Sequence, residues 1–323
     1  MYNIYLWKIK PTSSHMTLWQ SDTIYGHMLY AIAMLYGREE YDKIVNDFIE
    51  LKSPFIVSDG FIGEKLPLFN KSVVNRGDTE FFSKEINKDL VETVKTLKKI
   101  NKIKNISIEE FNKLRTSKYS NRDFVLDKLK NSKEEDKQKK DKPIQNTALV
   151  LHNNINRCRG TTVDNGIFSL KEYFINDNIY VFIKVREDFS IEKLDEILKF
   201  IEGNGFGKKV SSGKGAIERV TFEKYDKFQE IEGANAFISL SNYTPKEGDY
   251  TEVICGTPLV KRGKTADAGD NMNFPFKRPF SCFTAGALFK GSVNNEKGKV
   301  LTNIYINKNV VQIGIPFILG VEL

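Results

Sequence analysis

The sequence predicts an α+β protein built from short strands and two amphipathic helices. Three observations favour this class: an alternating aromatic segment precedes the first helical repeat, strand-like segments flank the second repeat, and the residues after 235 are mostly strand-like. The chain has 323 residues, of which 40% are hydrophobic and 12% aromatic. It can therefore bury a core and form more than one domain, which excludes global disorder.

The first element is a predicted strand over residues 2–9, which are rich in aromatics and alternate in polarity. A polar loop leads to residues 21–37, where apolar residues recur at helical spacing. Ser21 can cap this helix, Asp22 suits the positive end of its dipole, and Gly37 can end it. The sequence thus predicts a strand–loop–helix unit.

A long insertion is expected next, at about residues 38–145. Residues 53–69 mix prolines and glycines with apolar residues, which indicates irregular or short-strand structure. Residues 84–130 show a weak helical pattern. Residues 130–143 are charged and polar and offer nothing to a core, so they are predicted to be a mobile linker.

Strand-like patterns return at residues 147–156 and 178–186. The residues between them indicate the arm or tip of a long hairpin, at about 155–177. A second amphipathic helix follows, with Ser190 as its cap and Gly203 at its end.

A glycine-rich loop, residues 203–215, then leads into a strand over residues 216–225. The order across residues 2–225 is therefore β-α-(insertion)-β-β-α-β, which is that of a ferredoxin-like or RRM-like domain. We expect this domain to span residues 1–230. A second, mostly β unit, itself derived from a ferredoxin-like domain, is expected over residues 231–323.

The charge excess lies in one segment. The chain carries 49 Lys and Arg against 42 Asp and Glu, a balance of +7. Residues 84–147 hold 18 basic and 11 acidic residues, which equals the whole excess. Because the rest of the chain is balanced, any nucleic-acid site must be a local patch rather than a basic body.

The cysteines and histidines argue against a metal site or other cofactor. Cys158, Cys255 and Cys282 lie far apart, and the chain has only three histidines. Free cysteines favour a reducing, cytoplasmic location. No apolar run reaches the roughly 18 residues of a membrane span, and the N-terminus lacks a signal-peptide pattern.

The glycine-rich loop carries the clearest chemical signal. Glycines let a backbone approach a ligand, and N–H groups, lysine ammoniums and serine hydroxyls suit phosphate oxygens. Five residues separate Gly207 from Gly213, which breaks the Walker A spacing. The loop also follows a helix and precedes a strand, the reverse of the Rossmann context. A flexible surface loop and a clamp on a polynucleotide backbone remain as interpretations.

Four segments in order resemble a known family: SDTIYG, SPFIVSDGFIGEKLPLF, GFGKKVSSGKGAIE and GIPFILGVEL. With them the chain resembles the RAMP proteins of CRISPR systems. Among these it is most similar to the subunit of type III-A Csm complexes that caps the 5′ end of the guide RNA (crRNA). The resemblance spans most of the chain and is weakest over residues 70–145.

This resemblance implies a RAMP fold and a non-catalytic RNA-binding subunit. Such a subunit holds the repeat-derived 5′ tag of the crRNA and docks on the large polymerase-like signature subunit. It also joins the backbone RAMP subunits of the Csm complex, in antiviral defence. Its hairpin is expected to wedge into the guide–target duplex near the tag.

Candidate RNA-binding residues form two groups. The first belongs to the loop that the resemblance matches: Gly205, Gly207, Lys208, Lys209, Ser211, Ser212, Gly213, Lys214 and Gly215. The second lies in other segments: Arg157 and Arg159 beside the hairpin, His15 and Ser21 before the first helix, and Lys261 and Arg262 in the C-terminal half. Arginine forks suit phosphates and stack on bases, and a helix start suits anions. Surface solvation or simple capping is the alternative for the second group.

Other functions stay open. A Cas-six-like, metal-independent endoribonuclease that processes CRISPR precursor RNA would use His15 or His27 for acid–base chemistry. A backbone RAMP that cuts target RNA would use a metal-bound Asp22. A generic RRM-type binder would need stacked aromatics on a central strand, and no such signature is evident.

Overall fold

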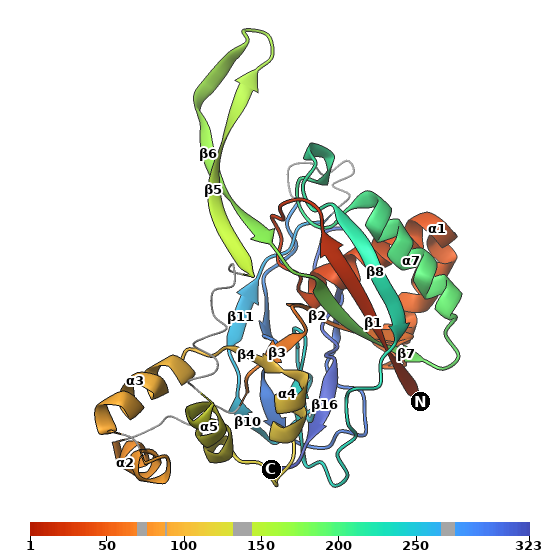
Figure 1. Cartoon of the computed structure of the whole chain (residues 1–323). Helices are drawn as coiled ribbons and strands as arrows, with labels where there is room; N and C mark the ends of the chain where they lie inside the picture. Colours follow the sequence, from red (N-terminus) through yellow and green to blue (C-terminus); the bar gives the residue numbers. More distant parts are fainter. Residues whose placement is uncertain (70–75, 88, 132–143, 266–274) are drawn as a thin grey trace.

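The computed structural model describes residues 1–69, 76–87, 89–131, 144–265 and 275–323. Most of the predicted linker at 130–143 lies outside these residues. Two four-stranded antiparallel sheets form the body, and a long hairpin and a group of short helices extend from it (Figure 1). Within the described residues, no helix is both long and apolar enough to cross a bilayer.

The first sheet has the strand order β2-β7-β1-β8. Its strands are β1 (Tyr2–Pro11), β2 (Phe55–Ile62), β7 (Ile179–Arg186) and β8 (Ile217–Lys224). In the two central strands Trp7 lies opposite Val181, and both are fully buried. Helices α1 (Ser21–Ile49) and α7 (Ile191–Asn204) lie side by side against this sheet (Figure 1).

The second strand of this sheet in chain order is not the segment that the sequence predicted. The sequence pattern placed it at residues 147–156, whereas the structure uses β2, which lies inside the predicted insertion. Residues 55–59 are all buried, so β2 lacks the polar alternation that marks a half-buried strand. A bulge between Val57 and Gly60 also breaks its register with β7.

Residues 147–156 belong to the hairpin instead. β5 (Gln145–Asn156) and β6 (Thr161–Ile175) form a separate two-stranded sheet that rises from the body (Figure 1). Leu149 and Leu151, which give this segment its apolar alternation, are 73% and 75% exposed. The hairpin is therefore longer than the arm predicted at 155–177.

The start of α7 agrees with the sequence. The Ser190 hydroxyl accepts the N–H of Lys193 at 3.0 Å, as an N-cap does. The helix ends at Asn204, and its C-cap is Gly205 instead of Gly203, because Gly205 takes the positive φ of 82° that leaves the helical conformation.

Gly37 interrupts α1 without ending it. Its φ of 79° kinks the helix, and a second helical stretch continues directly to Ile49. Ile44, Val45 and Phe48 are buried in that stretch. Their apolar face therefore stabilises helix beyond the point where the glycine predicted a stop.

Beyond β2, the described part of the insertion contains short helices and one two-stranded sheet. These are α2 (Arg76–Glu85), α3 (Leu90–Ile100), α4 (Ile108–Leu114), α5 (Asn121–Lys130), β3 (Lys65–Pro67) and β4 (Asn105–Ser107). The helical pattern over 84–130 is confirmed. Arg115, which is 1% exposed, ties this part to the body, because its Nε donates to the Gly320 carbonyl at 2.8 Å.

The C-terminal part contains the second sheet, in the order β10-β13-β9-β16. Its strands are β9 (Ala236–Ser239), β10 (Glu252–Cys255), β13 (Leu288–Lys290) and β16 (Ile318–Val321). Two smaller sheets pair β11 (Pro258–Lys261) with β12 (Phe280–Phe283) and β14 (Val300–Leu301) with β15 (Gln312–Ile313). The prediction of strands after residue 235 is confirmed.

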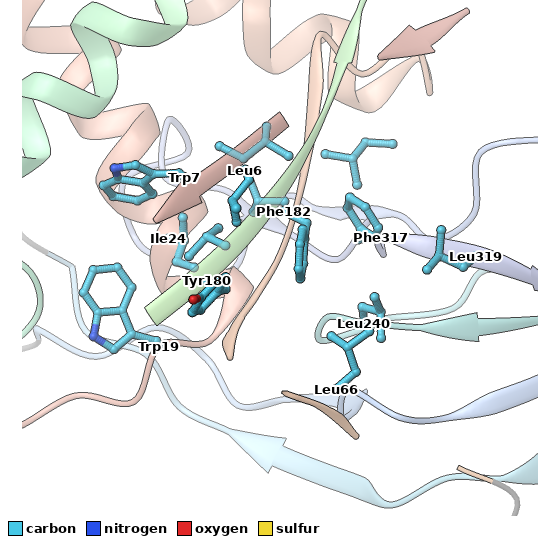
Figure 2. Close-up of a cluster of buried hydrophobic side chains, with 14 of the residues drawn as sticks. Leu6, Trp7, Trp19, Ile24, Leu66, Tyr180, Phe182, Leu240, Phe317 and Leu319 are labelled. Atoms are coloured by element: carbon cyan, nitrogen blue, oxygen red, sulfur yellow. The ribbon is translucent and has the colours of Figure 1, made fainter. Parts of the chain in front are cut away.

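One hydrophobic cluster extends across both sheets (Figure 2). Phe182 of β7 faces Phe317, which precedes β16, with the ring centroids 6.4 Å apart. Trp7 of β1 lies on the helical side, where its indole N–H donates to Glu202 of α7 at 2.7 Å. The first sheet is thus covered on both faces.

Candidate nucleic-acid interface

The glycine-rich loop, which follows α7, meets two other segments. These are the loop after β1 and the hairpin root, by which we mean residues 145 and 172–175. The Gly215 N–H donates to the Ser14 carbonyl at 2.9 Å, and the His15 N–H donates to the Tyr173 carbonyl at 2.8 Å. Backbone hydrogen bonds therefore hold the loop, the hairpin and the end of β1 together.

Phe206 anchors the glycine-rich loop. It is 1% exposed and stacks on Trp19, with ring centroids 3.8 Å apart and 13° between the planes. His27 of α1 covers it from another side, at 4.7 Å. Trp19 itself lies at the edge of the core cluster (Figure 2). The loop thus leaves the helix in a fixed direction rather than as a free surface segment.

Two backbone N–H groups of the glycine-rich loop, which the sequence predicted as phosphate donors, already form hydrogen bonds within the protein. The Gly207 N–H donates to His27 Nε2 at 3.0 Å, and the Lys208 N–H donates to Thr17 Oγ1 at 3.0 Å. Burial lowers the pKa of His27 to about 4, so its imidazole is neutral and can accept. These bonds position the loop and leave its tip for a ligand.

The tip of the loop presents the free donors. It contains the short 3₁₀ helix η1 (Val210–Ser212), and Lys209 before it has a φ of 63°. Among the described residues, no acceptor meets the consecutive backbone N–H groups of Lys209, Val210 and Ser211. The side chains of Lys208 and Lys209 are exposed beside them, as are Ser211 and Ser212. Successive N–H groups next to a left-handed residue form a concave anion site.

Lys214 is held differently from the other lysines of the loop. Its ammonium lies 2.8 Å from Glu172 Oε2 and 3.1 Å from Ser14 Oγ. Glu172, on β6, is 1% exposed, and the Ser14 hydroxyl also donates to it at 2.7 Å. Lys214 and Ser14 hold the pKa of this carboxyl below its ordinary range. The Lys214 ammonium is thus already paired with a carboxylate of the hairpin root.

His15, a candidate RNA contact in the sequence, is buried in the structure instead of exposed on a polar loop. It is 0% exposed, and its backbone exchanges two hydrogen bonds with Tyr173. Its Nδ1 lies 3.1 Å from the Ser13 carbonyl. Burial lowers the pKa of the imidazole, and the backbone hydrogen bonds fasten His15, in the loop after β1, to the hairpin root.

Ser21 is also buried, at 1% exposure, and does not cap α1. Its N–H donates to Asp59 Oδ1 at 2.7 Å, and its hydroxyl accepts the N–H of Asn242 at 2.9 Å. The carboxyl of Asp59 thus accepts an N–H at the start of α1, which is the capping role that the sequence assigned to Ser21. Burial raises the pKa of Asp59 to about 7. A strand distant in sequence supplies the capping group, which is why the local pattern missed it.

The two C-terminal candidates differ from each other. Lys261 is paired with Asp22 at 2.5 Å and donates to Gln20 at 2.8 Å, so its charge is compensated. Arg262 is exposed and lies over the Phe276 ring, 5.0 Å from its centroid. In the described part of the chain, no three His, Cys, Asp or Glu side chains gather to hold a metal ion.

Arg157 and Arg159 are exposed at the hairpin tip. At about 3.3 Å per residue, the tip is roughly 35 Å from the hairpin root. The structure therefore does not gather them with the glycine-rich loop (Figure 1). Arg157 and Arg159 lie between the paired ends of β5 and β6, whereas the base of the glycine-rich loop is bonded to the hairpin root through Lys214.

Sequence reasoning missed the residues that build the junction: Thr17, Trp19, Glu172, Tyr173 and Phe206. Each is ordinary in its local context, and their importance comes from contacts between distant segments. A partial signal was available in Phe206, because a large apolar residue inside a run of glycines and lysines has to pack against something.

The comparisons with known proteins identify the fold. No protein-family model matches the sequence, and no curated protein does. The Csm3–Csm4 subcomplex of a type III-A CRISPR-Cas interference complex matches with a TM-score of 0.63 and 18% identity, over 100% of both chains. Csm1–Csm4 cassettes match over 100% of this chain and 99% of theirs, at 0.59 and 14% with pppApA bound and 0.58 and 15% with cA4 bound.

The chain has the Csm4 fold. The resemblance seen in the sequence is thereby confirmed at the level of structure. Because the match covers the whole chain, the hairpin, the insertion and the second sheet all lie within the span that matches Csm4.

Proposed function

We propose that this chain is the crRNA-binding subunit of a type III-A CRISPR effector complex and holds the repeat-derived 5′ tag. In this role it links the large signature subunit to the backbone RAMP subunits in cytoplasmic antiviral defence, without cutting RNA itself. The Csm4 fold supports the proposal, since its neighbours are known in assemblies with Csm1 and Csm3. The first sheet supports a ferredoxin-like assignment, because β1-α1-β2-β7-α7-β8 has that element order.

One observation carries the RNA-binding part of this proposal. Within the described residues, the tip of the glycine-rich loop offers three backbone N–H groups that no acceptor meets, and it presents the exposed side chains of Lys208 and Lys209 on a firmly anchored base. These donors suit phosphate oxygens, and phosphate contacts position an RNA strand without reading its sequence. The exposed arginines at the hairpin tip would contact a more distant part of the same assembly.

The geometry favours a scaffold over the Cas-six-like endoribonuclease. His15 is buried at the hairpin root, and His27 accepts a backbone N–H. Neither is free to move a proton at an RNA ribose. Asp22, the candidate of the metal-dependent alternative, is paired with Lys261 and accepts from Asn242 at 2.8 Å.

The test compares two double variants of the full chain by titration of a short single-stranded RNA at several salt concentrations. Lys208→Ala with Lys209→Ala removes two proposed phosphate contacts. Lys95→Ala with Lys98→Ala removes the same charge from exposed positions on α3. We expect the first pair to lower the slope of log K against log salt by about 1.4, at about 0.7 per contact. The α3 pair should leave the slope unchanged, and equal slopes for both pairs would refute the loop site.

A second experiment separates the scaffold from the nuclease. The purified chain is incubated with repeat RNA in EDTA, and the products are resolved on a denaturing gel. We expect intact RNA. Specific cleavage that disappears on changing His15 and His27 would establish the endoribonuclease instead.

A further inference from the structure

Two asparagine–glycine pairs occur in the sequence, and the structure places them in different surroundings. Asn165 and Gly166 lie within β6 of the projecting hairpin (Figure 1). Asn204 lies at the end of α7 and is followed by Gly205. An asparagine followed by glycine is a labile pair, because no side chain shields the glycine nitrogen from the asparagine carboxamide. The fate of the same dipeptide can therefore be compared at two places in one chain.

The pair in the hairpin lies at an interruption of the strand ladder. The register between β5 and β6 shifts after Asn153, and residues 163–166 have no partner in the described ladder. Asn165 has a φ of 56°, in the left-handed region, and its side chain is exposed. Within the described residues, no hydrogen-bond partner meets its carboxamide. The carboxamide is therefore free to turn toward the glycine nitrogen.

The hairpin opens more readily than the body of the protein. β5 and β6 form a sheet of two strands, and Ile155 and Ile167 beside the interruption are 59% and 67% exposed. A pair of strands without further packing is at most marginally stable in water, and segments with few buried contacts open at low cost. Gly166 is buried in the bend, so this opening is what exposes its N–H to water.

The pair at the end of α7 is held closed. The Gly205 N–H donates to the Ile201 carbonyl at 2.8 Å, and the Asn204 side-chain amide donates to the Phe200 carbonyl at 2.8 Å. Ile201 is 2% exposed and belongs to the core cluster. Both groups that would have to react are thus hydrogen-bonded, and freeing them requires the end of a packed helix to unwind.

We propose that Asn165 is a site of spontaneous deamidation and that Asn204 is protected from the same reaction. The Gly166 nitrogen loses its proton to water or hydroxide and forms a bond to Asn165 Cγ. The bond from Cγ to Nδ2 then breaks, and this nitrogen takes up a proton and leaves as ammonia. Water opens the resulting succinimide ring. Addition of water at Cγ gives aspartate, and addition at the main-chain carbonyl carbon gives isoaspartate.

The reaction would change the hairpin in two ways. A carboxylate replaces a neutral amide next to Asp164, which is itself exposed, so this part of the hairpin repels a phosphate more strongly. Isoaspartate also adds one carbon to the main chain at the bend between the root and the arginines of the tip. The chemistry requires only water, so the inference does not depend on the proposed function.

The test incubates the full folded chain at neutral and at alkaline pH and follows both pairs by mass spectrometry after a brief tryptic digestion. Asn165 lies in the peptide of residues 160–171, and Asn204 lies in the peptide of residues 200–208. Deamidation changes the mass of a peptide by the difference between a hydroxyl and an amino group. Because two hydrogen bonds protect Asn204, we expect Asn165 to react about tenfold faster or more. Both reactions should accelerate at alkaline pH.

Two variants and a denatured sample provide the controls. Asn165→Gln should strongly slow the mass change in the hairpin peptide, because the longer side chain closes the corresponding ring far more slowly. Asn204→Gln should leave that change as it is in wild type. In urea the two pairs should react at similar rates, because the protecting structure is gone. Equal rates in the folded chain, no reaction at Asn165, or a difference that persists in urea would overturn the proposal.

Discussion

The contact between Lys214 and Glu172 allows the junction at the hairpin root to be tested by a single substitution. Lys214→Met keeps the aliphatic stem and removes the ammonium. Glu172, which is 1% exposed, would then keep only the Ser14 hydroxyl, at 2.7 Å, as a donor to Oε2. Its other oxygen, Oε1, already lacks a partner among the described residues.

The expected cost follows from leaving this carboxylate uncompensated. Breaking a deeply buried ion pair costs about 3–5 kcal/mol. The Lys214 side chain is 28% exposed, and the pair lies at the root of a projecting hairpin, where water can approach. We therefore expect Lys214→Met to lower the free energy of unfolding by about 1–3 kcal/mol, measured by urea denaturation at neutral pH.

The loss should depend on pH with a defined sign. The pKa of Glu172 is lowered from its ordinary value of 4.5, mainly by the hydrogen bond from Lys214. Its ionised form therefore contributes stability that is present above pH 4.5 and disappears as the pH falls through the lowered value. The difference between wild type and Lys214→Met should shrink over that same range of pH.

The double variant with Glu172→Gln provides the control. A neutral amide needs less compensation than a carboxylate, so this second change should recover part of the lost stability.

The salt slope of RNA binding by Lys214→Met should stay near the wild-type value, because the Lys214 ammonium is already paired with Glu172. Unchanged stability of Lys214→Met, or a fall in slope of about 0.7 as for a phosphate contact, would refute this reasoning.

Two further predictions concern the loop and the start of α1. Gly215→Ala should destabilise the fold by about 2 kcal/mol or more in thermal unfolding, because the φ of Gly215 is 71° and an added Cβ would clash with the Phe206 carbonyl. Gly213→Ala is the control, because Gly213 has a similar φ of 77° but open space around it. It should cost only about 1 kcal/mol. Equal effects would contradict the packing argument. The pKa of Asp59 is raised from 3.8 to about 7, so wild-type stability should fall as the pH rises from about 4 through 7, by about 4 kcal/mol at most. Asp59→Asn should flatten that profile, and an unchanged profile would show that Asp59 does not titrate there.

The local patterns identified most helices and the glycine-rich loop because their signals are contained in short stretches of chain. Ser190 caps α7 as its position predicts, and the apolar periodicity of residues 21–37 does mark a helix. Residues 53–69 do contain short strands as predicted, but the place of β2 in the first sheet was missed because its first five residues are buried and lack polar alternation. The exposed alternation of residues 147–156 looked like a sheet strand, yet it forms a projecting hairpin.

The sequence named the polar residues of the candidate site but not which of them are exposed, paired or buried. Lys208 and Lys209 are exposed as expected, whereas Lys214 is bound to Glu172 and His15 and Ser21 are buried. The sequence does not show which of these polar groups are exposed and which are buried. It could not do otherwise, because burial depends on segments that arrive from elsewhere in the chain.

The amino-acid order by itself determined that a glycine-rich, donor-rich turn follows an amphipathic helix, since glycine content and helical periodicity are local properties. Only the tertiary structure decided which of those donors remain available to a ligand. The acceptors that bind the others, His27, Thr17, Ser14 and Glu172, come from α1, the loop after β1 and the hairpin. A hydrogen bond forms over about 3 Å, so it depends on proximity in space and not on separation along the chain.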